Sequence, residues 1–137
     1  MARRSEVVRA AADALTIHQL TPRVYWTTPF GDTDRPVMGV ICGEKGSLIV
    51  ETGNSPAHME TFLIALETLN LPAPLFAAVT HWHWDHVFGG EALPVPIVAH
   101  DETARTVAEM SKLNWRDKAL DQRVAEGSEI GDRKSVV

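Results

Sequence analysis

The segment from residue 81 to residue 86 concentrates side chains that bind metal ions. It holds four potential ligands: His81, His83, Asp85 and His86. Because residues two apart in extended backbone point to the same side, we expect His81 and His83 to converge on one point. Asp85 and His86 follow a turn and are expected to reach a neighbouring point. Imidazole and carboxylate groups suit zinc, and also iron or manganese. This ligand segment therefore predicts a site for one or two metal ions.

Such a site would supply hydrolytic chemistry. A metal ion with an open coordination position lowers the pKa of its bound water to about 7. Asp85 is the predicted catalytic residue, because its carboxylate can both hold a metal ion and orient the attacking water. Trp82 and Trp84 alternate with the ligands and are expected to wedge the segment against the core. The isolated histidines are expected to be ordinary surface or core residues: His18, His58 and His100.

The surrounding pattern predicts strands and helices that alternate along the chain. The clearest helix begins after an N-cap at Ser55 and has Pro56 in its first position. Its apolar residues recur at spacings of three and four up to Leu69. The apolar run 75–80 predicts a buried strand that leads into the ligand segment. The other predicted strands are 23–29, both arms of 37–53, and 95–100; the other helices are 5–15, 101–110 with Asp101 as cap, and 112–127; a turn-rich loop covers 30–36. This order predicts an α+β (layered α/β) class, with helices laid on a sheet.

Composition bounds the remaining properties. The 137 residues predict a single domain, 1–137, with an N-terminal extension at 1–16 and a polar tail at 128–137. A net charge of −5 without a long basic run predicts no nucleic-acid partner. The lone Cys42 excludes an internal disulfide and predicts a buried thiol. No window approaches the ~18 apolar residues of a membrane span, and no apolar stretch follows Arg3 and Arg4, so we expect a cytoplasmic protein without a membrane partner.

The sequence "THWHWDH" (80–86) resembles the His-x-His-x-Asp-His signature of the metallo-β-lactamase superfamily. The context is also similar. "GSLIVETG" (46–53) resembles the strand that ends in Asp-Thr-Gly before the first helix of these proteins. "RVYWTT" resembles their early strand, and "VPIVAH" the strand after the metal-binding segment. The resemblance covers about residues 17–110 and implies an αββα sandwich, of which this chain supplies mainly the first half.

The resemblance also implies a metal-dependent hydrolase, most often a zinc enzyme. His81 and His83 would bind a first metal ion, and Asp85 and His86 a second. A bridging hydroxide would attack an ester, thioester, amide, lactam or phosphodiester bond of a small-molecule substrate. Glu51 stands where the family has Asp, and with Thr52 it is expected to support the ligands from behind.

The chain departs from the family pattern after Gly90. The family's second half supplies a third histidine for the first metal, a bridging aspartate and a last histidine, whereas only His100 follows here, too early for any of them. Three hypotheses stay open: a hydrolase whose other half lies outside this chain, a short metal-binding or interaction module without catalysis, and an enzyme completed by a partner or by oligomerisation. Because half a sandwich leaves an apolar sheet face bare, we expect a partner, a second copy or the folded-back C-terminal segment to cover it.

Overall fold

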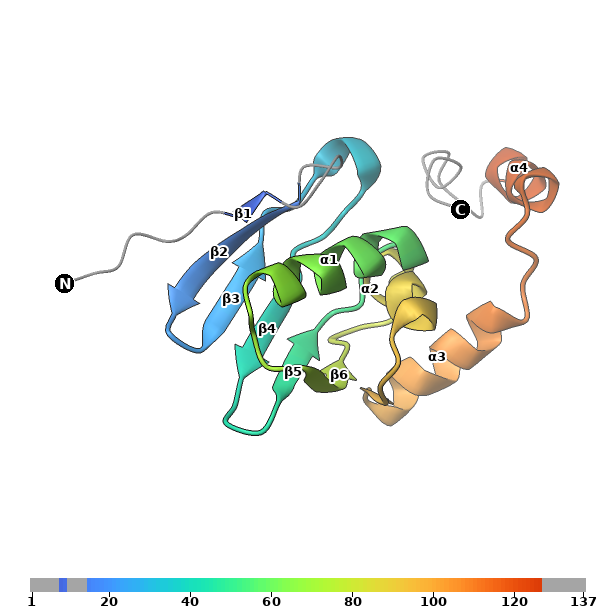
Figure 1. Ribbon diagram of the computed structural model, residues 1–137. Helices are drawn as coiled ribbons and strands as arrows, with labels where there is room; N and C mark the ends of the chain where they lie inside the picture. The colour runs from blue at the N-terminus through green and yellow to red at the C-terminus, as the bar shows by residue number, and fades with distance from the viewer. Residues whose placement is uncertain (1–7, 10–14, 127–137) are drawn as a thin grey trace.

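The computed structural model describes residues 8–9 and 15–126 and shows a seven-stranded mixed sheet with helices laid on it (Figure 1). The strands follow one another across the sheet in chain order. They are β1 (Val8–Arg9), β2 (Thr16–Thr21), β3 (Val24–Thr27), β4 (Gly39–Cys42), β5 (Ser47–Val50), β6 (Pro74–Ala78) and β7 (Ile97–Val98). Neighbouring strands are antiparallel from β1 to β5 and parallel from β5 to β7. The change to parallel pairing needs a crossover, which the first helix provides.

Helix α1 (Pro56–Thr68) lies across one face of the sheet and forms the core with it (Figure 1). It begins as predicted: the Ser55 hydroxyl accepts the N–H of His58 at 3.2 Å, and Pro56 occupies the first turn. The buried apolar side chains of the helix and sheet are Met59, Phe62, Ala65, Leu66, Ile17, Met38, Val40, Ile49 and Ala77. Cys42 is buried among them, as predicted. Burying each large side chain contributes about 1.5–3 kcal/mol, so this layer holds the sheet in place.

The remaining helices follow β6. They are α2 (Trp84–Val87), the 3₁₀ helix η2 (Phe88–Ala92), α3 (Asp101–Ser111) and α4 (Asp117–Ala125); a further 3₁₀ turn, η1, covers Gly31–Thr33. The prediction of Asp101 as the cap of α3 is wrong. His100 caps this helix instead, because its Nδ1 accepts the N–H of Glu102 at 3.2 Å. None of the helices within the described ranges is long and apolar enough to cross a membrane.

The helix predicted over 5–15 is wrong where it can be compared. Val8 and Arg9 pair with Ile17 and Thr16 as strand β1, and residues 5–7 and 10–14 lie outside the described residues. The alternating pattern of β2 was not recognised in the sequence. Its buried Ile17 faces α1, and tertiary packing of this kind overrides a short, weak helical periodicity.

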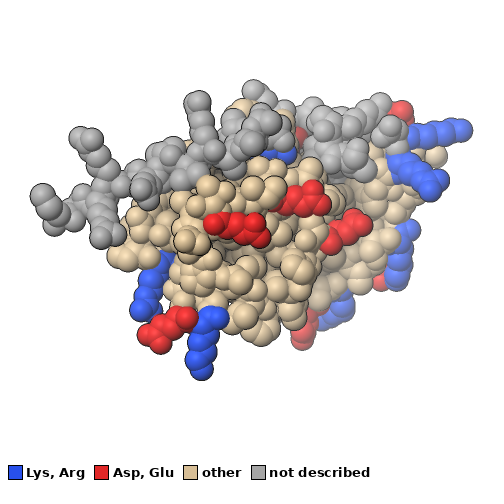
Figure 2. All heavy atoms as spheres, in the orientation of Figure 1, with Lys and Arg blue, Asp and Glu red and all other residues tan. Residues whose placement is uncertain are grey.

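The sheet face opposite α1 is apolar and open among the described residues. Strand pairing places two rows of side chains on it. One row joins Val24, Ile41, Leu48 and Phe76, and the other joins His18, Trp26, Gly39, Val50, Ala78 and Val98. Neither row contains a charged residue, and Phe76 is 50% exposed. The side that carries α1 differs, because acidic side chains gather near its middle while Lys and Arg lie mostly at its margins (Figure 2). The bare face is the one expected from half a sandwich.

Candidate metal centre

The ligand segment begins where two parallel strands end side by side. Glu51 directly follows β5, and Thr80 and His81 follow β6, the neighbouring strand. The ladder continues one step beyond β5, since the Glu51 N–H donates to the Ala78 carbonyl at 2.8 Å. Because the carboxyl ends of parallel strands meet at one edge of a sheet, side chains far apart in sequence come together here.

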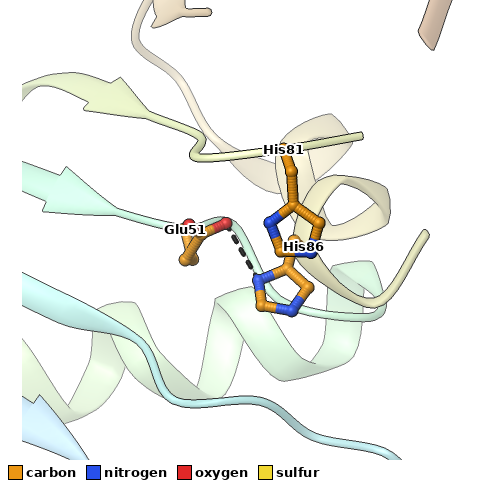
Figure 3. Close-up of side chains that lie close together, drawn as sticks. All are labelled: Glu51, His81 and His86. Carbon is orange, nitrogen blue, oxygen red and sulfur yellow. Dashed lines mark ion pairs between the residues drawn. The ribbon is translucent and has the colours of Figure 1, made fainter. Parts of the chain in front are cut away.

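Three side chains meet at this edge: Glu51, His81 and His86 (Figure 3). Each offers one ligand atom, and these atoms lie within 4.8 Å of one another. The Glu51 Oε2 atom lies 3.0 Å from Nδ1 of His86, and the rings of His81 and His86 have centroids 4.1 Å apart. The sequence assigned His81 and His86 to two neighbouring metal positions, with Glu51 behind them, whereas the structure brings these three side chains into one group.

Both imidazoles are held through Nδ1, which leaves Nε2 for a metal ion. Nδ1 of His81 lies 2.8 Å from the Thr80 hydroxyl, and the Thr80 N–H donates to Oε1 of Glu51 at 3.0 Å. Oε1 of Glu51 therefore accepts a hydrogen bond from Thr80, while Oε2 is ion-paired with His86. Metal-binding histidines characteristically donate their other ring N–H to a carboxylate or another oxygen, which fixes the tautomer and the ring. This donor set fits a metal ion held by Nε2 atoms, with Glu51 as the supporting carboxylate.

The charges of Glu51 and His86 stabilise each other. Burial alone would raise the pKa of Glu51, but hydrogen bonds from His86 and Thr80 outweigh burial and leave this pKa below its ordinary value. The hydrogen bond to Glu51 raises the pKa of His86, against the opposing effect of burial, and the Asp85 charge adds to the rise. Glu51 therefore stays ionised and gives the edge of the sheet a fixed negative charge beside the imidazoles.

His83 and Asp85 lie at the margin of this group. The exposed His83 ring lies 4.6 Å from that of His81, edge to face. Oδ2 of Asp85 lies 3.4 Å from Nε2 of His86. Two ligands about 2.1 Å from one tetrahedral ion would stand roughly 3.4 Å apart, so this spacing suits joint coordination. Trp84, unlike the exposed Trp82, is buried, so of the two only Trp84 anchors the segment in the core.

The turn at residues 51–53 is hydrogen-bonded to the end of the ligand segment and to the residues just after it. Thr52 donates both its N–H and its hydroxyl to the His86 carbonyl, at 3.0 and 2.9 Å. The Gly89 N–H donates to the Gly53 carbonyl at 3.0 Å. Thr52 thus supports the site through the backbone of His86 rather than through a ligand ring. Glu51 itself has a φ of 69°, a left-handed conformation that costs a side-chain-bearing residue about 1–2 kcal/mol. Such strain gathers at functional sites.

Gly89 is needed here for space rather than for a left-handed backbone. Among the described glycines only Gly53 has a positive φ, at 81°. A Cβ atom on Gly89 would lie 1.9 Å from the Thr52 carbonyl oxygen and 2.9 Å from that of Ser55. Only a residue without a side chain lets the segment lie this close to the turn.

Sequence reasoning missed Thr80 as a residue of the candidate site. Its N–H holds Glu51 and its hydroxyl holds His81, so it links the supporting carboxylate to a ligand. The available signal was its position, immediately before the first histidine and at the end of a predicted strand. A side chain there shares the sheet edge with Glu51, but this follows only once β5 and β6 are known to be parallel neighbours. The strand that leads to Thr80 was predicted to be buried, and this is wrong: in β6 only Ala77 is buried, whereas Leu75 and Phe76 are 49% and 50% exposed, because Phe76 lies on the open face of the sheet.

The fold and the site define an α+β protein with a candidate metal centre at the edge of its sheet. A sequence model of the metallo-beta-lactamase superfamily matches residues 31–136, and the chain belongs to this superfamily. The chain is similar to the solved structure of a metallo-beta-lactamase from Pontibacter korlensis, with 27% identity and a TM-score of 0.61, over 72% of this chain and 49% of that one.

A second solved structure shares the fold. It is a metallo-beta-lactamase from Erythrobacter litoralis with beta-mercaptoethanol in its active site, matched at 19% identity and a TM-score of 0.63 over 77% of this chain and 49% of that one. No curated protein matches. The chain thus spans about half the length of these solved structures, which confirms the α+β fold and the expectation that it corresponds to part of a metallo-β-lactamase domain.

Proposed function

We propose that this chain carries the first-half metal centre of a metal-dependent hydrolase, and that the metal is zinc. One observation carries the proposal: His81 and His86 each contact an oxygen through Nδ1, on Thr80 and Glu51, and Nε2 of His86 faces Oδ2 of Asp85 at 3.4 Å, a spacing that a shared metal ion would fit. Superfamily membership supports the reaction class. The proposed substrates are small molecules with an ester, thioester, amide, lactam or phosphodiester bond.

Each ligand residue has a proposed part in this chemistry. His81 and His83 hold one ion, while Asp85 and His86 hold a second or complete a single mixed site. A bound zinc ion lowers the pKa of its water to about 7 and so supplies hydroxide at neutral pH. Asp85 is the proposed catalytic residue, since its Oδ2 lies beside Nε2 of His86 and can accept a hydrogen bond from water there. Glu51 keeps His86 in the tautomer that binds metal.

The alternative is a metal-binding module without catalysis. It is supported by the share of the solved relatives that the chain spans, 49%, because the relatives' remaining half has no counterpart among these residues. Zinc sites normally have three or four protein ligands, so an incomplete set would bind zinc without turning over substrate.

Removing two histidines should abolish metal binding. We expect the wild-type chain, dialysed against zinc and then buffer, to retain at least about one ion per chain, and the double variant His81→Ala/His83→Ala to retain none, because too few imidazoles remain. Elemental analysis of the purified proteins measures this. His18→Ala is the matched control. His18 lies in β2 and its side chain is hydrogen-bonded to Thr28, outside the ligand segment, so this variant should keep its full metal content.

Retention of stoichiometric zinc by the double variant would refute the role of these histidines. Substrate turnover distinguishes the hydrolase from the metal-binding module without catalysis. The zinc-loaded chain is tested with chromogenic ester, thioester, lactam and phosphodiester substrates. Hydrolysis that the double variant lacks supports the enzyme, and tight zinc binding without turnover of any of them supports the module.

We also propose that a second copy of this chain covers the open sheet face. Neither of the two rows on this face, one of which contains Ile41 and Phe76, has a charged residue, so two-fold pairing brings no like charges together although the chain carries a net charge of −5. Two copies of one twisted sheet also have matching curvature, and sheets pack face to face about 10 Å apart with strands about 30° from parallel.

A charge placed on this face should separate the copies. We expect wild-type protein to be a dimer by light scattering, and Phe76→Lys to weaken dimerisation at least about tenfold, since a buried unpaired ammonium group costs several kcal/mol. Ile64→Lys is the control, because Ile64 is 59% exposed on α1, away from the sheet face. Circular dichroism checks that both variants fold. A wild-type monomer at all concentrations, or an unaffected Phe76→Lys dimer, would overturn the proposal.

A further inference from the structure

His58 is a fully buried histidine that the metal chemistry does not use. It lies in the first turn of α1 with 0% of its surface exposed. Its Nδ1 accepts the N–H of Asn54 at 3.3 Å. The sequence indicated an ordinary surface or core residue, and its burial alone agrees with the second of these. Its neighbours on the turn give it a more specific position.

The imidazole of His58 lies directly against the turn that carries Glu51. A Cβ atom on Gly53 would stand 2.6 Å from Nδ1 of His58, so the ring and the backbone of the turn are in close contact. The other side of this turn holds the metal centre, through the Glu51–His86 pair and the bond from Gly89 to Gly53. His58 therefore backs the turn from the core side while the ligand segment is bound to its outer side.

Packing does not explain why this residue is a histidine. Because Nδ1 accepts a hydrogen bond, the neutral ring carries its proton on Nε2. Nε2 of His58 is buried and has no hydrogen-bond partner among the described residues. An unpaired buried donor costs about 1–3 kcal/mol, so an apolar side chain of similar size would serve the core better. What an apolar side chain lacks is the Nδ1 acceptor that holds the Asn54 N–H.

We propose that His58 is a positioning residue for the metal centre, which fixes the 51–53 turn through its Nδ1 acceptor and thereby sets the place of Glu51 and His86. The expected effect on metal binding rests on the proposed function, whereas the hydrogen bond to Asn54 and the contact with the turn do not. It acts through the turn and touches neither metal nor substrate.

Two substitutions separate the acceptor from the packing. His58→Leu keeps an apolar filling and removes the acceptor, whereas His58→Asn keeps an oxygen near the position of Nδ1 and fills less space. We expect His58→Leu to fold at neutral pH but to bind zinc at least about tenfold more weakly, the size of effect that lost support behind a ligand produces. His58→Asn should recover most of this affinity although its core is less filled. If the zinc affinity of each variant follows its free energy of unfolding, and does not depend on whether the hydrogen-bond acceptor is present, the proposal is wrong.

A measurement on the metal-free protein keeps this inference separate from the proposed function. Amide hydrogen exchange of Thr52 and Gly89 reports the two backbone bonds that join the turn to the ligand segment. We expect both amides to exchange at least about tenfold faster in His58→Leu and near the wild-type rate in His58→Asn, while Ile49 in the core is unchanged. If the wild-type chain binds no zinc, the proposed function fails and this result still decides the role of His58. If His58→Leu does not fold, His58→Met replaces it in both measurements, because the flexible methionine side chain adapts more easily to the same space. Unchanged Thr52 and Gly89 exchange in the apolar variant would refute the positioning role.

Discussion

Gly89→Ala should lower the free energy of unfolding by about 3 kcal/mol and abolish zinc binding. The added methyl group would stand 1.9 Å from the Thr52 carbonyl oxygen, and the Ser55 carbonyl oxygen lies 2.9 Å away on the same side. Both are backbone atoms, so no side-chain rotation can relieve the overlap. The segment must move away from the turn, and this breaks the bond from Gly89 to Gly53 and displaces the His86 carbonyl from Thr52. Overpacking costs about 1–3 kcal/mol, and this overlap lies at the severe end.

Urea unfolding and zinc titration of the purified variant measure the two effects. Gly31→Ala is the matched control, because a Cβ atom on Gly31 would meet nothing within 4 Å and its φ is not left-handed. This control should unfold within about 0.5 kcal/mol of wild type, as surface substitutions do. A Gly89→Ala protein as stable as the Gly31→Ala protein, with zinc affinity intact, would show that the segment does not rest on the turn.

The sequence was informative where the signal is local. Ser55 and Pro56 mark the start of α1, and the four potential ligands gather within one short segment that follows a strand. Such signals arise from capping and from the period of apolar residues, which depend on neighbours in the chain. The open sheet face was also expected, because the family resemblance ends where a second layer should begin.

The arrangement inside the site could not be read in the same way. The Glu51–His86 pair joins residues separated by 35 positions, and the contact of Gly89 with Thr52 depends on how closely two backbones approach. Both require the parallel register of β5 and β6 and the left-handed turn at Glu51. Strand register and a strained backbone are set by the whole fold, so the residue types indicate the ligands but not how they are held.

Acid should destabilise this protein through His58. Burial lowers the pKa of His58 from 6.5 to about 4, and the positive charge of Arg35 adds to the effect. In the unfolded chain this histidine takes up a proton below about pH 6.5, whereas in the folded protein it stays neutral down to about pH 4. The unfolded state therefore binds more protons in this window, so stability is present above it and is lost as the pH falls from 6.5 towards 4. At 1.36 kcal/mol for each pKa unit, the full loss is about 3 kcal/mol.

His86 acts in the opposite direction, since the pKa raised by Glu51 makes its contribution greatest at low pH. A difference between two proteins therefore isolates His58. Urea unfolding of metal-free wild type and His58→Leu is measured at pH 7 and pH 4.5 with a chelator present. We expect wild type to lose about 2 kcal/mol more than the variant between these values, because leucine at this position cannot take up a proton in either state. Equal losses would mean that His58 is also charged in the folded protein at pH 4.5, and would contradict the depressed pKa that its full burial produces.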